Sequence, residues 1–381
     1  MIEVRHAEPR PPLISHGRSS ASPEYAGARP LADSRERRIP SLDGVRAVAF
    51  LAVFVAHLGY EKVIPGGFGV TTFFFLSGFL ITTLLRKEAE QAGSISIGRF
   101  YVRRVLRIVP PFLFALALSS AVTVALGGDL RLRMIGIELA QLTNYAIAAG
   151  HEAGKPLGSG VIWSLAVEEH FYLVFPLVYV GLRAKVASPR RRVAILLALC
   201  LSALAWRCVL VIGTGAGASR TYFTTDTRFD SILFGCVLAE LRNPALDQLW
   251  LEERHWKRIL FPAAIVVLLA TFLIRDPTFR ETIRYTIQGL ALIPIFVVIV
   301  RYPGWGALRL LNGRIVSWLA ERSYTLYLVH YTVILAAEKL MGVDGLLAGA
   351  VALPLSLLIA QCIYVAVERP CARLRNRLLH A

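Results

Sequence analysis

Charged residues are scarce in this chain. Only 18% of its 381 residues are charged and 55% are hydrophobic, whereas a soluble domain carries about a quarter charged residues. The apolar residues fall in blocks of about 18 to 25 residues, long enough for a helix to cross about 30 Å of hydrocarbon. These blocks are too long and too uniformly apolar for barrel strands. The predicted fold class is therefore all-α, a polytopic helix bundle in a membrane.

Cysteine is also scarce, and its spacing excludes the usual metal sites. The five cysteines are Cys200, Cys208, Cys236, Cys362 and Cys371. They show no metal-ligand spacing and most lie inside apolar blocks, which favours a packing role. We therefore predict no metal site and no permanently bound cofactor. The net charge of +16 does not predict nucleic-acid binding, because the basic residues form short runs between apolar blocks, a pattern typical of membrane orientation.

The apolar blocks give ten candidate spans. They cover residues 43–60, 68–86, 108–127, 161–182, 193–213, 229–241, 258–274, 285–301, 323–341 and 346–367. If all of them cross the membrane, six basic runs fall on one side, which predicts two cytoplasmic termini and a multi-pass protein of the inner (plasma) membrane. Residues 131–150 are only moderately apolar and are predicted to be interfacial or re-entrant.

The predicted membrane domain, residues 39–370, is flanked by two basic segments. Residues 1–38 are rich in Pro, Ser and Arg and lack an apolar core, which predicts a disordered cytoplasmic tail. Residues 371–381 are predicted to be a second, basic cytoplasmic tail.

The first span contains an arginine and a histidine. Arg46 and His57 are about three helical turns apart, so they share a face and lie about 16 Å apart along the axis. An ionisable group within a membrane is costly and marks a function by default, which favours a functional role for His57. The alternative is a buried histidine bonded to a neighbouring helix, with Arg46 reaching the interface.

The fourth span contains two adjacent carboxylates in the stretch WSLAVEEHFYLVFPL. Glu168 and Glu169 point about 100° apart, at a depth similar to that of His57. A carboxylate beside an imidazole orients it and suits a general base, so both are candidate catalytic residues. The alternative is a structural ion pair between helices. Trp163, Ser164 and Tyr172 in the same stretch are candidates for lining the site.

Three further stretches supply candidate binding residues. Arginine forks match phosphate geometry, although the run FYVRRVLRIVPPF is equally compatible with an ordinary positive-inside cluster. The stretch SYTLYLVHYTVI places tyrosines and His330 in an apolar run, as interface anchors, structural groups or site lining. Arg228 and Asp230 could contact an acceptor hydroxyl or form a helix-start pair. The residues concerned are Arg103, Arg104, Arg107, Arg228, Asp230, Tyr324, Tyr327 and His330.

These stretches together resemble the membrane acyltransferase-3 family, which O-acylates carbohydrates and some secondary metabolites. SLDGVRAVAFLAVFVAH is similar to its opening motif of Arg, ten residues and His. FGVTTFFFLSGFLI, RRVLRIVP, WSLAVEEHFYLVFP, RFDSILFGCVLA, SYTLYLVHYTV and the terminal VERP follow in the family's order. Many members carry an acidic residue after the GV of the second span, where this chain has Thr71. If that acid positions a basic partner, the partner must be satisfied differently here.

The resemblance implies ten core helices and an acyl-CoA donor. It transfers the family's essential Arg and His to Arg46 and His57, and its basic pair to Arg104 and Arg107. The function predicted is O-acyl transfer, with acetyl as the expected group, from cytoplasmic acyl-CoA as co-substrate to a surface or lipid-linked polysaccharide. The partners expected are the donor, a carbohydrate or glycolipid acceptor and membrane lipid. A small acceptor such as a macrolide sugar is the alternative, and a ten-helix transporter or exporter is the rival class.

Overall fold

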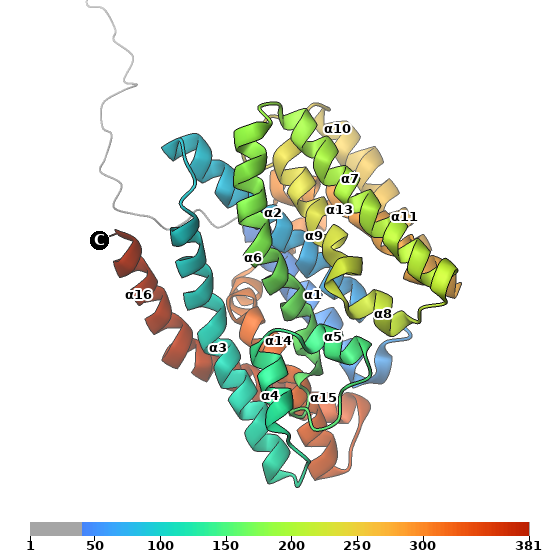
Figure 1. Cartoon of the computed structure of the whole chain (residues 1–381), viewed down its shortest axis with the longest axis vertical. Coiled ribbons are helices and arrows are strands. Elements are labelled where there is room, and N and C mark those ends of the chain that lie inside the picture. The colour runs from blue at the N-terminus through green and yellow to red at the C-terminus, as the bar shows by residue number, and fades with distance from the viewer. Residues whose placement is uncertain (1–39, 381) are drawn as a thin grey trace, which may run out of the picture. The chain divides into compact units, whose positions relative to one another are not determined.

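The computed structural model describes residues 40–380, and every regular element in that range is a helix (Figure 1). The longer helices are α1 (Pro40–Val55), α2 (Gly66–Ala92), α3 (Ile97–Ala125), α6 (Ile162–Lys185), α7 (Pro189–Cys208), α9 (Thr225–Leu241), α11 (Phe261–Leu273), α13 (Arg284–Arg301), α14 (Arg314–Met341) and α15 (Gly345–Ile363). The shorter ones are α4 (Leu132–Leu139), α5 (Thr143–Ala148), α8 (Ala218–Phe223), α10 (Glu253–His255), α12 (Pro277–Glu281) and α16 (Arg369–His380). Short π-helical or 3₁₀-helical segments extend several of these helices. The π-helical segments are Ala56–Tyr60, Val209–Gly213, Trp256–Leu260 and Tyr364–Glu368, and the 3₁₀ segments are Ser159–Val161 and Gly306–Asn312.

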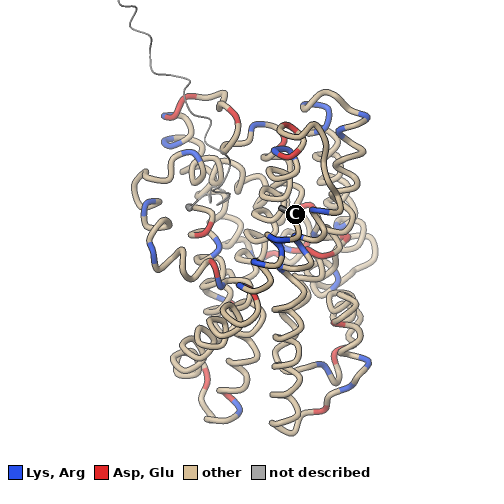
Figure 2. The backbone as a smooth tube through the Cα atoms, turned by 90° about the vertical axis from the view of Figure 1, so that its left-hand side faces the viewer, with Lys and Arg blue, Asp and Glu red and all other residues tan. Residues whose placement is uncertain are grey.

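The helices confirm the predicted all-α class of a polytopic membrane protein. Within residues 40–380, eight helical runs are long and apolar enough to cross a membrane. They are Ser41–Tyr60, Gly66–Ala92, Ile97–Ala125, Ser159–Lys185, Pro189–Gly213, Glu253–Leu273, Arg284–Arg301 and Gly345–Leu379. Each contains or overlaps one predicted span. Long stretches of helix carry no charge (Figure 2), and the sequence of α11 contains no charged residue. The count of ten spans and the cytoplasmic side of the termini stay predictions.

The other two predicted spans, 229–241 and 323–341, fall in the polar helices α9 and α14. Helix α9 has only 17 residues and includes the buried charged groups Arg228, Asp230 and Glu240. Helix α14 has 28 residues and buries Arg322 and His330. Helix α9 packs against α2, α7 and α13, and α14 against α1, α3 and α15. Charged groups in a membrane are tolerated when they face protein, which is how these two helices accommodate their buried charges.

The contact between α2 and α9 is close enough to exclude a side chain. A Cβ at Gly78 would lie 1.9 Å from the carbonyl oxygen of Ile232, and one at Gly235 would lie 2.0 Å from that of Phe75. Small residues at such crossings let helix backbones approach, which is a main source of packing energy between helices in lipid. These two glycines therefore hold α9 against α2 and fix the core of the bundle.

The flanking segments differ in what the structure shows. The tail predicted over residues 1–38 lies outside the described residues. Residues 131–150, predicted to be interfacial or re-entrant, form the short helices α4 and α5. Residues 371–380 belong to α16, which continues from α15 through the segment Tyr364–Glu368. The basic C-terminal segment is therefore helical through His380.

We expect Gly235→Ala to destabilise the protein, because the added methyl group overlaps the α2 backbone. Overpacking of this kind costs about 1–3 kcal/mol, visible as a lower thermal midpoint of detergent-solubilised protein by size-exclusion chromatography. Gly181→Ala in α6 is the matched control, since nothing lies within 4 Å of its added Cβ. Equal midpoints for the two variants would contradict the close α2–α9 crossing.

Candidate active site

His57 lies where the first helix opens. It lies in the π-helical segment Ala56–Tyr60, which directly follows α1. Gly59, two residues after His57, has a φ of +89°. That left-handed conformation is readily adopted by glycine, so the chain turns away directly after the histidine. The ring of His57 is only half-buried and lines a cavity of about 680 Å³. The helix end therefore presents the imidazole to a space that could hold a substrate.

His57 is hydrogen-bonded to a second histidine from the other end of the sequence. Its Nδ1 lies 2.9 Å from Nε2 of His330 in α14. The two rings stack with centroids 5.1 Å apart, and the ring of Tyr331 stacks on His57 at 4.5 Å. His330 is fully buried beside Phe50 and Phe54. The pair holds α1 against α14 and fixes the orientation of the His57 ring.

The second contact of His330 determines the tautomer of both rings. Its Nδ1 lies 2.7 Å from the carbonyl oxygen of Tyr327 and 3.1 Å from that of Leu326. A carbonyl only accepts, so Nδ1 of His330 carries the proton, and in the neutral ring Nε2 must then be an acceptor. His57 therefore donates from Nδ1, which leaves the lone pair on its own Nε2. A base oriented by a hydrogen bond on its other nitrogen is the arrangement that general-base or nucleophilic catalysis requires.

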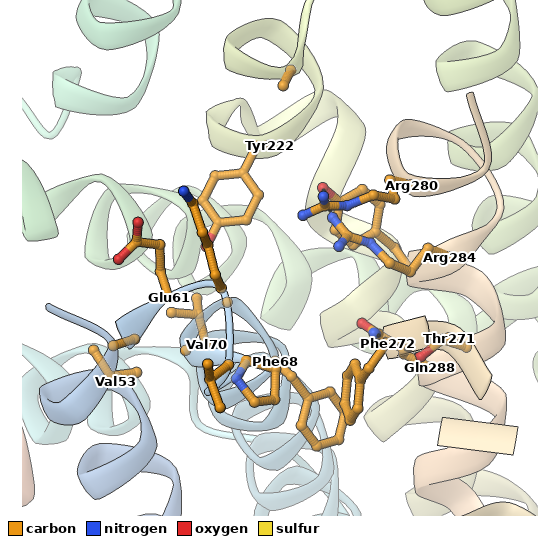
Figure 3. Close-up of a pocket in the computed structure, with 18 of the residues that line it drawn as sticks. Val53, Glu61, Phe68, Val70, Tyr222, Thr271, Phe272, Arg280, Arg284 and Gln288 are labelled. Atoms are coloured by element: carbon orange, nitrogen blue, oxygen red, sulfur yellow. Dashed lines mark hydrogen bonds between the residues drawn. The ribbon is translucent and has the colours of Figure 1, made fainter. Parts of the chain in front are cut away.

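The cavity beside His57 is lined by aromatic and charged side chains (Figure 3). Trp163 and Tyr327, both predicted to line the site, are among them, together with Tyr222. Trp163 packs on Tyr222 with centroids 4.9 Å apart. The hydroxyl groups of Ser164 and Tyr327 are 2.7 Å apart, which ties α6 to α14 just behind the cavity wall.

The carboxylates of α6 belong to a different cluster. Glu168 accepts a hydrogen bond from Ser77 at 2.6 Å, and Ser77 accepts one from Tyr172 at 2.9 Å. The guanidinium of Arg104 lies 4.7 Å from the centre of the Tyr172 ring. Among the residues that the structure describes, no hydrogen bond joins His57 to Glu168 or Glu169, and one buried oxygen of Glu169 has no partner. The structure thus gives His57 a histidine partner instead of the expected carboxylate.

Three of the four arginines predicted to bind the donor lie near one another. Arg46, paired with Asp43 at 3.0 Å, is close enough to Arg104 and Arg107 for their charges to interact. Arg103 instead points to Glu88, at 3.1 Å. This inner arginine cluster, Arg46, Arg104 and Arg107, lies at the end of α1 opposite to His57. Excess positive charge of this kind suits an anionic ligand.

Arg228 and Asp230 are both fully buried but are not paired with each other. Asp230 accepts from Arg207 at 2.7 Å, and both side chains of this pair are fully buried. Arg228 donates to Thr71 at 3.0 Å, and its guanidinium lies 4.1 Å from the centre of the Tyr285 ring. Arg228 is thus the basic partner that faces Thr71, where relatives are expected to carry an acid. Aromatic faces, the Thr71 hydroxyl and the Tyr222 carbonyl contact it here, while its Nε has no hydrogen-bond partner among the described residues. Tyr324 donates to the carbonyl of Ile108 at 3.0 Å.

Sequence reasoning missed several residues of the site. Glu61, Tyr222, Arg280, Glu281 and Arg284 line the cavity. All of them lie outside the predicted spans or at their ends, where charged residues are common and a hydropathy pattern gives no signal. Within residues 40–380, no cluster of three or more His, Cys, Asp or Glu side chains could hold a metal ion.

The fold and site define a class, a multi-pass helical membrane protein with a histidine-centred cavity. Residues 39–365 match the family profile described as an acyltransferase domain, acyltransferase-3. That match covers well over half of the chain, so the chain belongs to the acyltransferase-3 family. No solved structure matches it.

Curated relatives carry O-acetyltransferase names. The O-acetyltransferase OatA of Staphylococcus aureus strain NCTC 8325 / PS 47 is 30% identical over 354 residues, covering 88% of this chain and 57% of its own length. OatA of strain COL matches equally. Another protein of strain COL, with a provisional O-acetyltransferase name, is 31% identical over 310 residues, covering 78% of this chain and 51% of its own. The chain spans about half the length of the curated relatives it matches.

We expect Thr71→Val to lower stability, because it removes a hydrogen bond to a buried guanidinium. The loss should be about 1–3 kcal/mol, measured as a lower thermal midpoint in detergent. Thr71→Asp should keep or raise the midpoint, since a carboxylate can pair with Arg228. Thr72→Val is the control, because the Thr72 hydroxyl bonds the Phe68 carbonyl of its own helix. A midpoint for Thr71→Val equal to that of the control would remove the role given to this contact.

Proposed function

We propose that this chain is a membrane O-acyltransferase that moves an acetyl group from cytoplasmic acetyl-CoA to a hydroxyl of a carbohydrate, in the inner (plasma) membrane of a bacterium. The observation that carries the proposal is His57, which lines the cavity and is held by His330 in the tautomer that leaves its Nε2 unprotonated. The O-acetyltransferase names of the relatives favour acetyl as the transferred group. A surface or lipid-linked polysaccharide is the proposed acceptor.

The inner arginine cluster supports a donor site for acyl-CoA. One guanidinium group can donate two parallel hydrogen bonds to a phosphate, and the CoA nucleotide carries several phosphates. Arg46 and His57 are eleven positions apart, which is about 16 Å along a helix axis. This distance is comparable with an extended pantetheine arm. A donor held by its phosphates at the arginines would therefore bring its thioester to the histidine.

Polar groups lie near each of the two ends. Tyr172, Ser77 and Glu168 lie next to Arg104, and Ser164 and Tyr327 lie next to the cavity. Their hydroxyl and carboxyl groups could bond the amides of a pantetheine arm. In this arrangement Glu168 contributes to donor positioning, and the imidazole receives its orientation from His330.

In the proposed step Nε2 of His57 removes the proton of the acceptor hydroxyl. The oxygen attacks the thioester carbonyl, the new C–O ester bond forms, the C–S bond breaks, and the CoA thiolate leaves and takes the proton back from the imidazolium. A site within a helix bundle limits the access of water and so limits hydrolysis of the thioester. His330 donates to the Tyr327 carbonyl throughout and is a positioning residue.

We expect His57→Ala to abolish O-acetylation, since a positioned general base contributes about 10²- to 10⁴-fold. Strains with equal membrane levels of wild type or variant are compared by mass spectrometry of surface glycans and secreted metabolites, seeking an acetyl increment. The matched control is His151→Ala, in an exposed loop. His330→Ala should give a smaller loss, in kcat more than in KM, with partial rescue by His330→Gln. Retained acetylation in His57→Ala would refute the role of the histidine.

We expect Arg104→Gln and Arg107→Gln to weaken binding of the donor, each by about tenfold for one lost charge-assisted contact. Binding of desulfo-CoA to purified protein is measured by calorimetry. Arg103→Gln is the control, because Arg103 is ion-paired with Glu88 and should change the dissociation constant little. If all three variants bind desulfo-CoA as wild type does, the donor phosphates are held elsewhere.

A further inference from the structure

Two arginines enter the cavity from the loop region between α11 and α13. Arg280 ends α12 with Glu281, and Arg284 begins α13. The two are four residues apart, and their guanidinium groups point into the cavity, with Glu61 on the opposite wall in this view (Figure 3). Both side chains are half-buried. Neither arginine belongs to the inner arginine cluster, which lies at the other end of α1.

The charge of this pair is only partly compensated by the protein. Within the described residues, the side chain of Arg280 has no ion pair or hydrogen bond. Arg284 donates to the Tyr285 hydroxyl at 3.1 Å, but its buried Nε has no partner. The nearest oxygen of Glu281 is 3.9 Å from Arg284, while its other oxygen accepts from Thr221 at 2.6 Å. Charged groups at the cavity wall are four basic and two acidic: Lys62, Arg275, Arg280, Arg284, Glu61 and Glu281. Partly buried cations without partners are costly unless a ligand supplies the anion.

The rest of the wall suits a sugar ring. Trp163, Tyr222, Phe68 and Phe272 present aromatic surface to the same space, and Gln288 adds an amide (Figure 3). Apolar walls with a few fixed polar groups are typical of small-molecule sites. His57 lines this cavity as well, so a molecule bound there by an anionic group would lie in the same chamber as the proposed base.

We propose that Arg280 and Arg284 bind an anionic group of the acceptor, so that the acceptor is an acidic carbohydrate carrying a carboxylate or a phosphate. The assignment of this ligand as the acceptor rests on the proposed function, whereas the binding itself does not depend on turnover. The guanidinium pair anchors the acid group, the aromatic wall packs on the ring, and a free hydroxyl is presented to Nε2 of His57. A neutral sugar would leave the side chain of Arg280 without a partner, and Arg284 with only its long ion pair to Glu281 and its hydrogen bond to Tyr285.

The test measures direct binding of sugars to the purified full chain in detergent. Binding is monitored by saturation-transfer NMR, which detects weak ligands. The probes are methyl glucuronoside, glucose 6-phosphate and the neutral methyl glucoside. Wild type should bind at least one acidic sugar about tenfold more tightly than the neutral one, the effect of one charge-assisted contact. Comparing the two acids shows whether the site prefers carboxylate or phosphate. Equal binding of all three probes, or no binding at millimolar concentration, overturns the proposal.

Variants locate the binding to the pair. Arg280→Gln and Arg284→Gln should each remove most of the preference for the acid, and Arg280→Lys should keep part of it. Arg133→Gln, an exposed arginine outside the cavity, removes the same charge and should leave the preference unchanged. A loss of the same size in Arg133→Gln would show that net charge, not this pair, is responsible.

One further arm separates this proposal from the proposed function. If Arg280→Gln and Arg284→Gln lose binding of desulfo-CoA while sugars bind as before, the pair holds the donor and the acceptor assignment is wrong. If the acidic sugars bind through the pair but no acetyl increment depends on His57, the anion-binding site is confirmed and the proposed transferase function is contradicted.

Discussion

One hydrogen-bonded chain, from the Tyr327 carbonyl through His330 to His57, sets the chemistry of the whole site. The carbonyl can only accept, so it fixes the proton on Nδ1 of His330, and this in turn fixes the proton on Nδ1 of His57. The histidines are 273 residues apart in the sequence, so the base exists only when α1 and α14 are docked. Phe50 and Leu326, both fully buried, belong to the cluster that joins these helices.

The same docking explains why two helices of this membrane protein can be polar. Helices α9 and α14 carry charged groups that would be costly against lipid, and each is surrounded by more apolar helices. Their charges are matched inside the bundle: Arg207 binds Asp230, and Arg192 binds Glu240 at 2.5 Å. Removing one partner of such a pair leaves a buried charge uncompensated and costs more than the pair contributes. The polar interior thus specifies the arrangement of the helices that the histidine pair requires.

Local pattern was enough to predict the helical class, because span length and hydropathy are properties of single segments. It also identified His57, Trp163 and Tyr327, which line the cavity. It failed for the partner of His57. Glu168 or Glu169 was expected there because these residues lie at a depth similar to that of His57, but depth along the membrane normal does not determine which way a helix face points. Arg280 and Arg284 were missed because a charge outside the spans looks like an ordinary loop residue until the fold turns it inward.

The two ends of α1 carry two separate groups of cations. The inner arginine cluster concentrates the positive charge that the phosphates of the proposed donor would match, whereas the cavity around His57 combines aromatic walls with a second, separate pair of cations. One ligand could not satisfy both sites without spanning the bundle, and a phosphate-bearing donor with a long flexible arm is a chemical class that does so. The second pair of cations then calls for an anion on the other reactant. The protein would in this way discriminate both substrates by charge at sites remote from the bond that is made, while the histidine contacts only the hydroxyl and the thioester.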